Sequence, residues 1–72
     1  MKQVFWQGRP KCDVCRKNLE SSQFIYDAKT IFGPWALMCE DCFKEQTNGK
    51  LGLGIGQKYK RQEDGRFLKV EG

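Results

Sequence analysis

Two pairs of cysteines constrain this chain more than any other feature of its sequence. Each pair has the form Cys-x-x-Cys, and 23 residues separate one pair from the other. Two residues between cysteines let both sulfurs of one turn reach a single ion, and two such pairs complete a tetrahedron around Zn²⁺. The chain contains no histidine, so four cysteines are the complete ligand set. We therefore predict one zinc ion bound by Cys12, Cys15, Cys39 and Cys42.

Other uses of paired cysteines stay open at this point. Two structural disulfides would suit an oxidising compartment, and a thioredoxin-like redox pair would need a βαβ pattern around Cys12. An iron site of the rubredoxin type uses similar cysteine pairs. The stretch from Met1 to Arg9 lacks the apolar segment of a secretory signal, and no apolar run approaches a membrane span of roughly 18–20 residues. We expect a cytoplasmic protein without a membrane partner, and zinc ligands are then the preferred interpretation.

The short length of the chain gives a reason for a metal. A chain of 72 residues is near the lower limit for a self-sufficient core, and domains of this size usually recruit a metal or disulfides. We predict a single domain over residues 1–72. Its formal charge of +4 counts the thiols as neutral. Four thiolates and one Zn²⁺ would lower that charge to about +2, which is only a mild indication of an anionic partner.

The predicted ligand set indicates a structural metal and not a catalytic one. Catalytic zinc keeps one position open for water or substrate, whereas four protein ligands close the site. Without histidine the chain lacks the commonest general base, and Ser21 and Ser22 have no evident activating partner. We therefore predict that the protein is not an enzyme and has no catalytic residue.

The segments around the cysteines predict a small, metal-stabilised α+β fold of the treble-clef type. Such a Cys₄ zinc finger consists of a knuckle, a β-hairpin and a short helix, here in a zinc core at residues 11–49. We expect the knuckle at Cys12–Lys17 and the helix at Asp41–Thr47, ended by Asn48-Gly49. The predicted strands are Gln3–Gln7, Gln23–Tyr26, Ile31–Phe32 after a turn at Asp27–Thr30, and Trp35–Met38.

A glycine-rich segment at residues 51–56 alternates aliphatic residues with glycine. Its glycines do not have the spacing of a Walker loop or of a dinucleotide-binding loop, which argues against nucleotide binding. We expect an extended segment that packs Leu51, Leu53 and Ile55 on the core. A flexible loop that closes on a partner is the alternative.

The C-terminal residues 57–71 predict a β-hairpin around Asp64-Gly65. A two-residue loop would place Lys60 opposite Lys69, at a cost of a few tenths of a kcal/mol. An anionic partner, a slipped register or simple solvation of the two side chains would each remove that cost. The same register puts Tyr59, Leu68 and Val70 on the core face and Phe67 on the other face, with the lysines. The candidate partner-binding residues are Lys58, Tyr59, Lys60, Arg61, Phe67 and Lys69.

Much of the chain between Lys11 and Tyr59 resembles a group of small zinc-finger proteins encoded by bacteriophages. The stretches Gly33–Phe43 and Leu51–Tyr59 match their patterns G-P-W-A-x-M-C-x-x-C and G-x-G-x-G-Q-x-Y. The resemblance implies a phage accessory protein acting in the host cytoplasm, and it implies no particular activity. A looser similarity to the zinc-binding domain of the bacterial unfoldase that works with the Clp protease supports the treble clef. That domain serves in dimerisation and in adaptor or substrate binding.

The aromatic content of the chain indicates a binding function. Nine aromatic residues are more than so small a core can hide, and exposed aromatic side chains mark interfaces. We expect a module that binds a host protein. The alternative is nucleic-acid binding, in which the basic residues of the hairpin contact phosphates while Tyr59 and Phe67 stack on bases. These basic residues are Lys58, Lys60, Arg61, Arg66 and Lys69. The sequence leaves the partner and the oligomeric state open.

Overall fold

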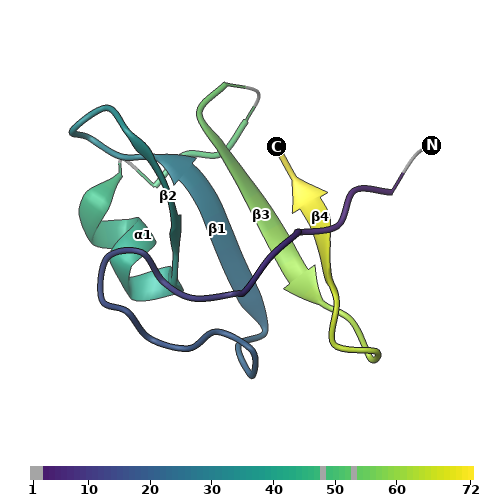
Figure 1. Cartoon of the computed structure of the whole chain (residues 1–72). Helices are drawn as coiled ribbons and strands as arrows, with labels where there is room; N and C mark the ends of the chain where they lie inside the picture. Colours follow the sequence, from purple (N-terminus) through teal and green to yellow (C-terminus); the bar gives the residue numbers. More distant parts are fainter. Residues whose placement is uncertain (1–2, 48, 53) are drawn as a thin grey trace.

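The computed structural model describes residues 3–47, 49–52 and 54–72 of the chain. These residues form one antiparallel sheet with the strand order β2-β1-β3-β4, together with one short helix (Figure 1). The predicted small α+β fold is therefore confirmed. No helix of the described part is long and apolar enough to cross a membrane. The elements are β1 Phe24–Lys29, β2 Trp35–Met38, α1 Glu40–Gln46, β3 Gly56–Arg61 and β4 Phe67–Glu71.

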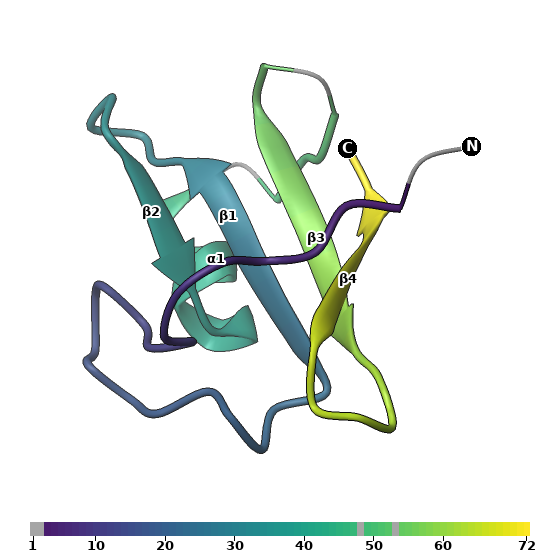
Figure 2. The ribbon, with the colours of Figure 1, turned by 45° about the vertical axis from the view of Figure 1, so that its right-hand side comes forward.

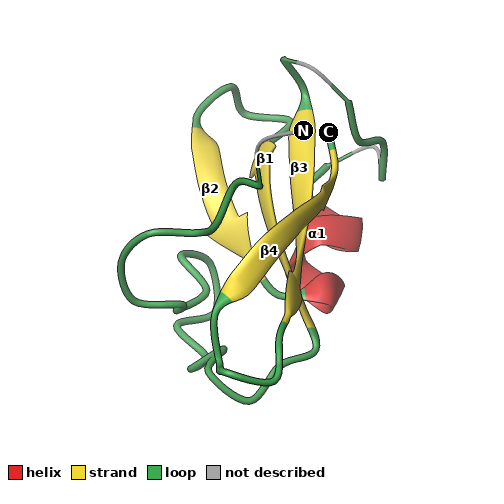
Figure 3. Ribbon diagram, turned by 90° about the vertical axis from the view of Figure 1, so that its right-hand side faces the viewer, coloured by secondary structure: helices red, strands yellow, loops and turns green. Residues whose placement is uncertain are grey.

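The sheet lies between α1 on one face and the N-terminal segment on the other (Figure 3). Alternation along β1 directs Tyr26 and Ile25 to opposite faces. On the helix face, the ring of Tyr26 stacks on that of Phe43, with centroids 4.4 Å apart. On the other face, Ile25 pairs with Tyr59, and Trp6 meets the Tyr59 ring edge-on at 5.8 Å. Each face therefore has an aromatic pair that anchors its covering element to the sheet.

The N-terminal segment pairs only briefly with β4. Phe5 and Leu68 form an isolated antiparallel bridge, and the Trp6 N–H donates to the carbonyl of Phe67 at 2.9 Å. The predicted strand at Gln3–Gln7 is thus reduced to a single bridge. Beyond it the chain crosses the sheet towards the first cysteine pair, as Figure 2 shows, and leaves the edge of β4.

The hairpin of β1 and β2 turns later than predicted. Asp27 lies inside β1, and the turn falls at 30–34, where the Thr30 N–H donates to the Pro34 carbonyl at 3.0 Å. The predicted strand Ile31–Phe32 is part of this turn, so both predictions were wrong. The strand β1 pairs with β2 on one side and with β3 on the other. These pairings outweigh the local turn preference of Asp27.

The predicted helix is confirmed with a shift of one residue. Helix α1 spans Glu40–Gln46, and its last turn is closed by the Thr47 hydroxyl, which donates to the Phe43 carbonyl at 2.6 Å. Asn48, half of the predicted stop, lies outside the described residues. Gly49 has φ of 74°, the left-handed conformation expected just past a helix end.

The glycine-rich segment forms a tight loop and is not extended as predicted. The N–H of Gly52 donates to the carbonyl of Gly56 at 2.9 Å, and the N–H of Gly56 donates back to Gly52 at 3.0 Å. Leu51 packs against the core as expected, whereas Ile55 is exposed in the turn. Leu53, which was also assigned to the core face, lies outside the described residues.

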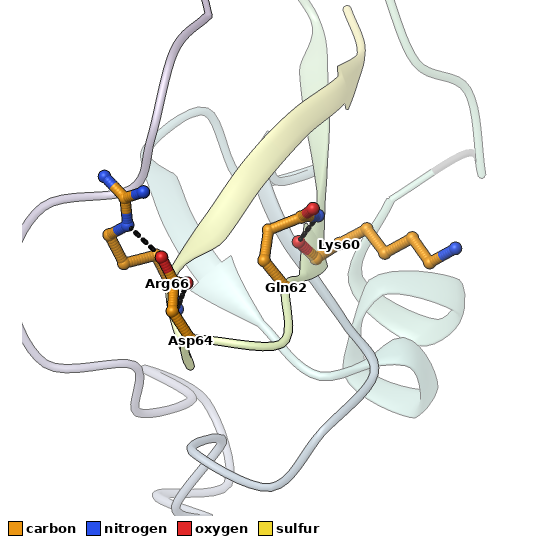
Figure 4. Close-up of polar contacts among 4 residues, drawn as sticks. All are labelled: Lys60, Gln62, Asp64 and Arg66. Carbon is orange, nitrogen blue, oxygen red and sulfur yellow. Dashed lines mark hydrogen bonds and ion pairs between the residues drawn. The ribbon is translucent and has the colours of Figure 1, made fainter.

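The C-terminal hairpin has its turn at the predicted place but with a longer loop. The Gln62 N–H donates to the Arg66 carbonyl at 2.7 Å, which leaves the three residues at 63–65 in the loop. Gly65, with φ of 89°, takes the left-handed position that such loops require. The Asp64 carboxylate accepts from the Arg66 backbone N–H at 3.0 Å and from its Nε at 2.8 Å (Figure 4). These bonds stabilise the three-residue form.

The longer loop shifts the register by one residue and moves the side chains of β4 to the other face. Lys60 lies opposite Leu68 and not opposite Lys69. The predicted repulsion between two directly opposed lysines therefore does not arise. Phe67 is buried, although it was predicted on the outer face. Val70, predicted in the core, is exposed.

Candidate metal centre

The first cysteine pair lies in a tight turn. The Cys12 N–H donates to the Lys17 carbonyl at 2.9 Å, and the Arg16 N–H donates to the Cys12 carbonyl at 3.0 Å. Arg16 has φ of 68°, a left-handed conformation that is uncommon for residues other than glycine. The turn brings the Cys15 N–H to within 3.4 Å of the Cys12 sulfur. Both sulfurs therefore belong to one compact loop at the predicted knuckle.

The second pair lies where β2 passes into α1. Cys39 occupies the N-cap position, and its carbonyl accepts the Phe43 N–H at 2.9 Å. Its side chain makes no capping hydrogen bond, which leaves the sulfur free to act as a ligand. Cys42 follows in the first helical turn and is buried. The helix therefore fixes the spacing of these two sulfurs.

The four sulfurs converge on one point. All of them lie within 4.8 Å of one another, and the Sγ atoms of Cys15 and Cys39 are 3.8 Å apart. A tetrahedron with Zn–S bonds of about 2.3 Å has edges of about 3.8 Å. A disulfide would need S–S of about 2.05 Å, and all four cysteines are free thiols. The predicted set is therefore brought together in an arrangement that fits one tetrahedral metal ion.

The electrostatics of the cluster also suit a cation. Burial raises the pKa of Cys12, but backbone N–H groups of Cys15, Cys39 and Val14 near its sulfur outweigh burial and lower that pKa to about 6. Burial and the neighbouring sulfurs raise the pKa of Cys42 well above its ordinary value. The lowered pKa of Cys12 thus favours a thiolate there, whereas the raised pKa values of Cys15 and Cys42 resist further ones. A divalent cation would remove that resistance, because metal coordination deprotonates thiols.

Asp13 joins the two halves of the site, a role that the sequence analysis missed. The Asp13 N–H donates to the Leu37 carbonyl at 2.8 Å, and the Leu37 N–H donates to Asp13 Oδ2 at 2.9 Å. Asp13 directly follows Cys12, and Leu37 lies two residues before Cys39. The contact therefore fixes one ligand pair relative to the other. It also covers part of the outer edge of β2.

Two of the candidate partner-binding residues are buried and do not reach solvent. Tyr59 lies beneath Trp6, and Phe67 belongs to the same hydrophobic core. The burial of both rings corrects the prediction that they stack on the bases of a nucleic acid. The register shift explains Phe67, whereas Tyr59 had already been predicted to face the core.

The basic candidates do not form a single patch. Lys58 lies over the ring of Phe24, with its Nζ 4.2 Å from the centroid. Lys60 and Arg61 are exposed, but they are consecutive in β3 and so face opposite sides of the sheet. Lys69 is half-buried. The sheet therefore divides the charges that the hairpin was predicted to concentrate.

Exposed apolar side chains gather instead at one end of the sheet. We call this region the loop-end surface; it comprises Ile31, Phe32, Trp35 and Ile55, from the turn between β1 and β2 and from the glycine-rich segment. Phe32 is 76% exposed, the largest value among the exposed large hydrophobic residues of the described part of the chain. Ile31 and Ile55 line one common pocket. The aromatic surplus of the sequence was the signal for such a surface, although it did not indicate the place.

Comparisons of this chain with models of known protein families, with curated proteins and with solved structures found no match in any of the three. The four-sulfur cluster and the loop-end surface must therefore be interpreted from their own geometry and chemistry.

Proposed function

We propose that the protein is a structural-zinc module of the treble-clef type that binds a partner protein without catalysing a reaction. The convergence of four cysteine sulfurs at tetrahedral spacing is the observation that carries the zinc assignment. The order of a knuckle-like turn, a β-hairpin and a helix around the cluster supports the treble clef.

A structural role follows from the ligand set. Cys12, Cys15, Cys39 and Cys42 would occupy all four positions of a tetrahedral ion, so that no position remains for water or substrate. The absence of histidine from the sequence also removes the usual general base. The metal would act as a cross-link between the first turn and the β2–α1 junction, and its binding free energy would contribute to folding.

A protein partner is favoured by the loop-end surface. Large exposed aromatic side chains such as Phe32 and Trp35 are typical of the few residues that supply most of the binding energy at an interface. The alternative, nucleic-acid binding by the C-terminal hairpin, loses its stacking residues because Tyr59 and Phe67 are buried. The resemblance to phage-encoded zinc fingers supports a host protein in the cytoplasm as the target.

Affinity capture from a bacterial cytoplasmic extract tests this proposal. The zinc-loaded protein should retain a specific protein both with and without nuclease treatment, and the variant Phe32→Ser should retain less. Val4→Ser is the matched control, since Val4 is exposed on a different part of the molecule. Retention of nucleic acid alone, or retention that nuclease abolishes, would refute the proposal.

A further inference from the structure

We propose that the loop-end surface binds an acidic segment of the partner protein, with one aliphatic or aromatic side chain of that segment inserted in the pocket between Ile31 and Ile55. This inference rests on the proposed function and specifies the chemistry of the partner.

The pocket lies where three segments meet at the end of the sheet. Figures 1 and 2 show the turn after β1 and the loop before β3 at the same end, next to the C-terminal end of α1. The pocket has a volume of about 180 Å³. Small-molecule sites usually have about 300–1,000 Å³, so this pocket suits a single inserted side chain better than a cofactor. Its lining residues are Lys29, Thr30, Ile31, Thr47, Lys50 and Ile55.

The charge around the pocket selects an acidic partner. Lys29 and Lys50 are its only charged lining residues, and neither belongs to an ion pair within the described part of the chain. Another pocket, beside Cys39, contains Lys17 and Lys58 together with Glu40 and Asp41, so that its lining residues carry no net charge. Of these two pockets, the one at the loop end has positive charge and no acidic residue in its lining. Complementary charge favours encounter with acidic segments and disfavours basic ones.

The apolar residues beside the pocket supply further contact area. Trp35 is paired with Lys29 in the sheet, and Phe32 lies in the adjoining turn. Large aromatic side chains next to a small pocket are typical of binding hot spots, because they exclude water from the central contact. An anchor side chain in the pocket would thus lie beside two lysines, and the exposed aromatic residues of the adjoining turn and strand would extend the contact.

The surface is held in place by backbone hydrogen bonds before any partner binds. The Ile31 N–H donates to the Gln46 carbonyl at 2.8 Å, which fastens the turn to the end of α1. The Lys29 N–H donates to the Ile55 carbonyl at 3.0 Å, which fastens β1 to the glycine-rich segment. Ordering these segments would cost little on binding, and preorganisation of this kind increases affinity.

A second copy of the chain is a poor occupant of this surface. A two-fold dimer brings the same patch of each copy together, so Lys29 and Lys50 of both copies would meet across the interface. Like charges in that position oppose association. The positive charge that favours an acidic segment therefore disfavours self-pairing.

A library of short random peptides, screened against the zinc-loaded protein, tests the inference. Selected peptides should be rich in Asp and Glu around one aliphatic or aromatic residue, and their affinity should be measured by fluorescence anisotropy. We expect Ile55→Glu and Lys50→Glu each to weaken binding by about tenfold or more. The controls Val70→Glu and Lys60→Glu should change it by less than about twofold; Val70 is 45% exposed and Ile55 44%. Zinc content and circular dichroism would verify that each variant is folded.

Several results would overturn the inference. These are selection of basic peptides, failure to select any peptide above the background of Ile55→Glu, unchanged binding by both loop-end variants, and self-association through this surface.

The proposed function has its own separate outcome. If the variants capture the same cellular protein as the original chain, the protein partner stands and this surface is the wrong one. If nucleic acid alone is captured, the proposed function itself fails.

Discussion

The contact between Asp13 and Leu37 allows a sharp test of how the two halves of the metal site are aligned. The Asp13 carboxylate accepts the Leu37 N–H at 2.9 Å, and Leu37 is 3% exposed. Asp13→Ala removes the acceptor of this part-buried hydrogen bond and leaves the Leu37 N–H without its charged partner. The return bond from the Asp13 N–H to the Leu37 carbonyl is made by the backbone and persists in the variant.

The expected magnitude follows from this geometry. A hydrogen bond to a charged group contributes about 1.5–3 kcal/mol, which is more than a bond between neutral groups. We therefore expect Asp13→Ala to lower the free energy of unfolding by about 1.5–3 kcal/mol. Asp13→Asn keeps an acceptor oxygen and loses only the charge, so it should cost about half as much.

Urea unfolding at a fixed, saturating concentration of free zinc measures these differences, because a change in zinc occupancy would alter the apparent stability. Asp41→Ala is the matched control: it removes the same charge from the other cysteine pair, where Asp41 is exposed in the first turn of α1. That control should cost no more than about 0.3–1 kcal/mol. If Asp13→Ala costs no more than Asp41→Ala, the contact does not align the site.

Three further substitutions test other parts of the structure, each by urea unfolding of the zinc-loaded protein. Gly56→Ala should cost about 1–3 kcal/mol, because its Cβ would lie 3.0 Å from Ala28 Cβ; failure of Ala28→Gly to recover part of the loss would contradict this overpacking. Asp27→Asn should stabilise the protein at pH 7, because burial and the charge of Asp13 raise the pKa of Asp27, so that the native state binds its proton more tightly than the unfolded chain. The gain should shrink as the pH falls towards that pKa, and a gain that grows instead would be inconsistent with this origin. Arg16→Gly should increase stability by up to about 1 kcal/mol, because glycine adopts φ of 68° without strain, and a clear loss would argue against the left-handed turn.

Features encoded within one turn of chain were predictable from the sequence. The Cys-x-x-Cys spacing indicated all four ligands, and the cluster confirms that they meet. The helix at Glu40–Gln46 was placed within one residue, since acidic residues at its start and Gly49 after its end are local signals. Such signals need no knowledge of the rest of the fold.

The faces of the C-terminal hairpin could not be predicted reliably, because they depend on the count of residues in one loop. Asp64-Gly65 is compatible with loops of two or three residues. The structure has the longer loop, in which Asp64 bonds to Arg66 and Gly65 is left-handed. A difference of one residue exchanged the faces of β4, and it moved Phe67 from the proposed binding surface into the core.

Contacts between distant segments were the remaining source of error. Asp27 looked like a turn residue because its partners in β2 and β3 are far away in the sequence. The bond between Asp13 and Leu37 joins residues 24 apart, and no local pattern indicates it. The loop-end surface likewise depends on a turn and a glycine-rich segment meeting at one end of the sheet.

Titration of the reduced, metal-free protein with Zn²⁺, followed by far-ultraviolet circular dichroism, tests the central claim most directly. If Cys12, Cys15, Cys39 and Cys42 hold one structural ion, the spectrum should change from that of an unfolded chain to that of a folded one. The change should be linear up to a single equivalent and then stop, and a chelator should reverse it. A metal-free protein that already has the folded spectrum, or a titration without a break at one equivalent, would contradict the account.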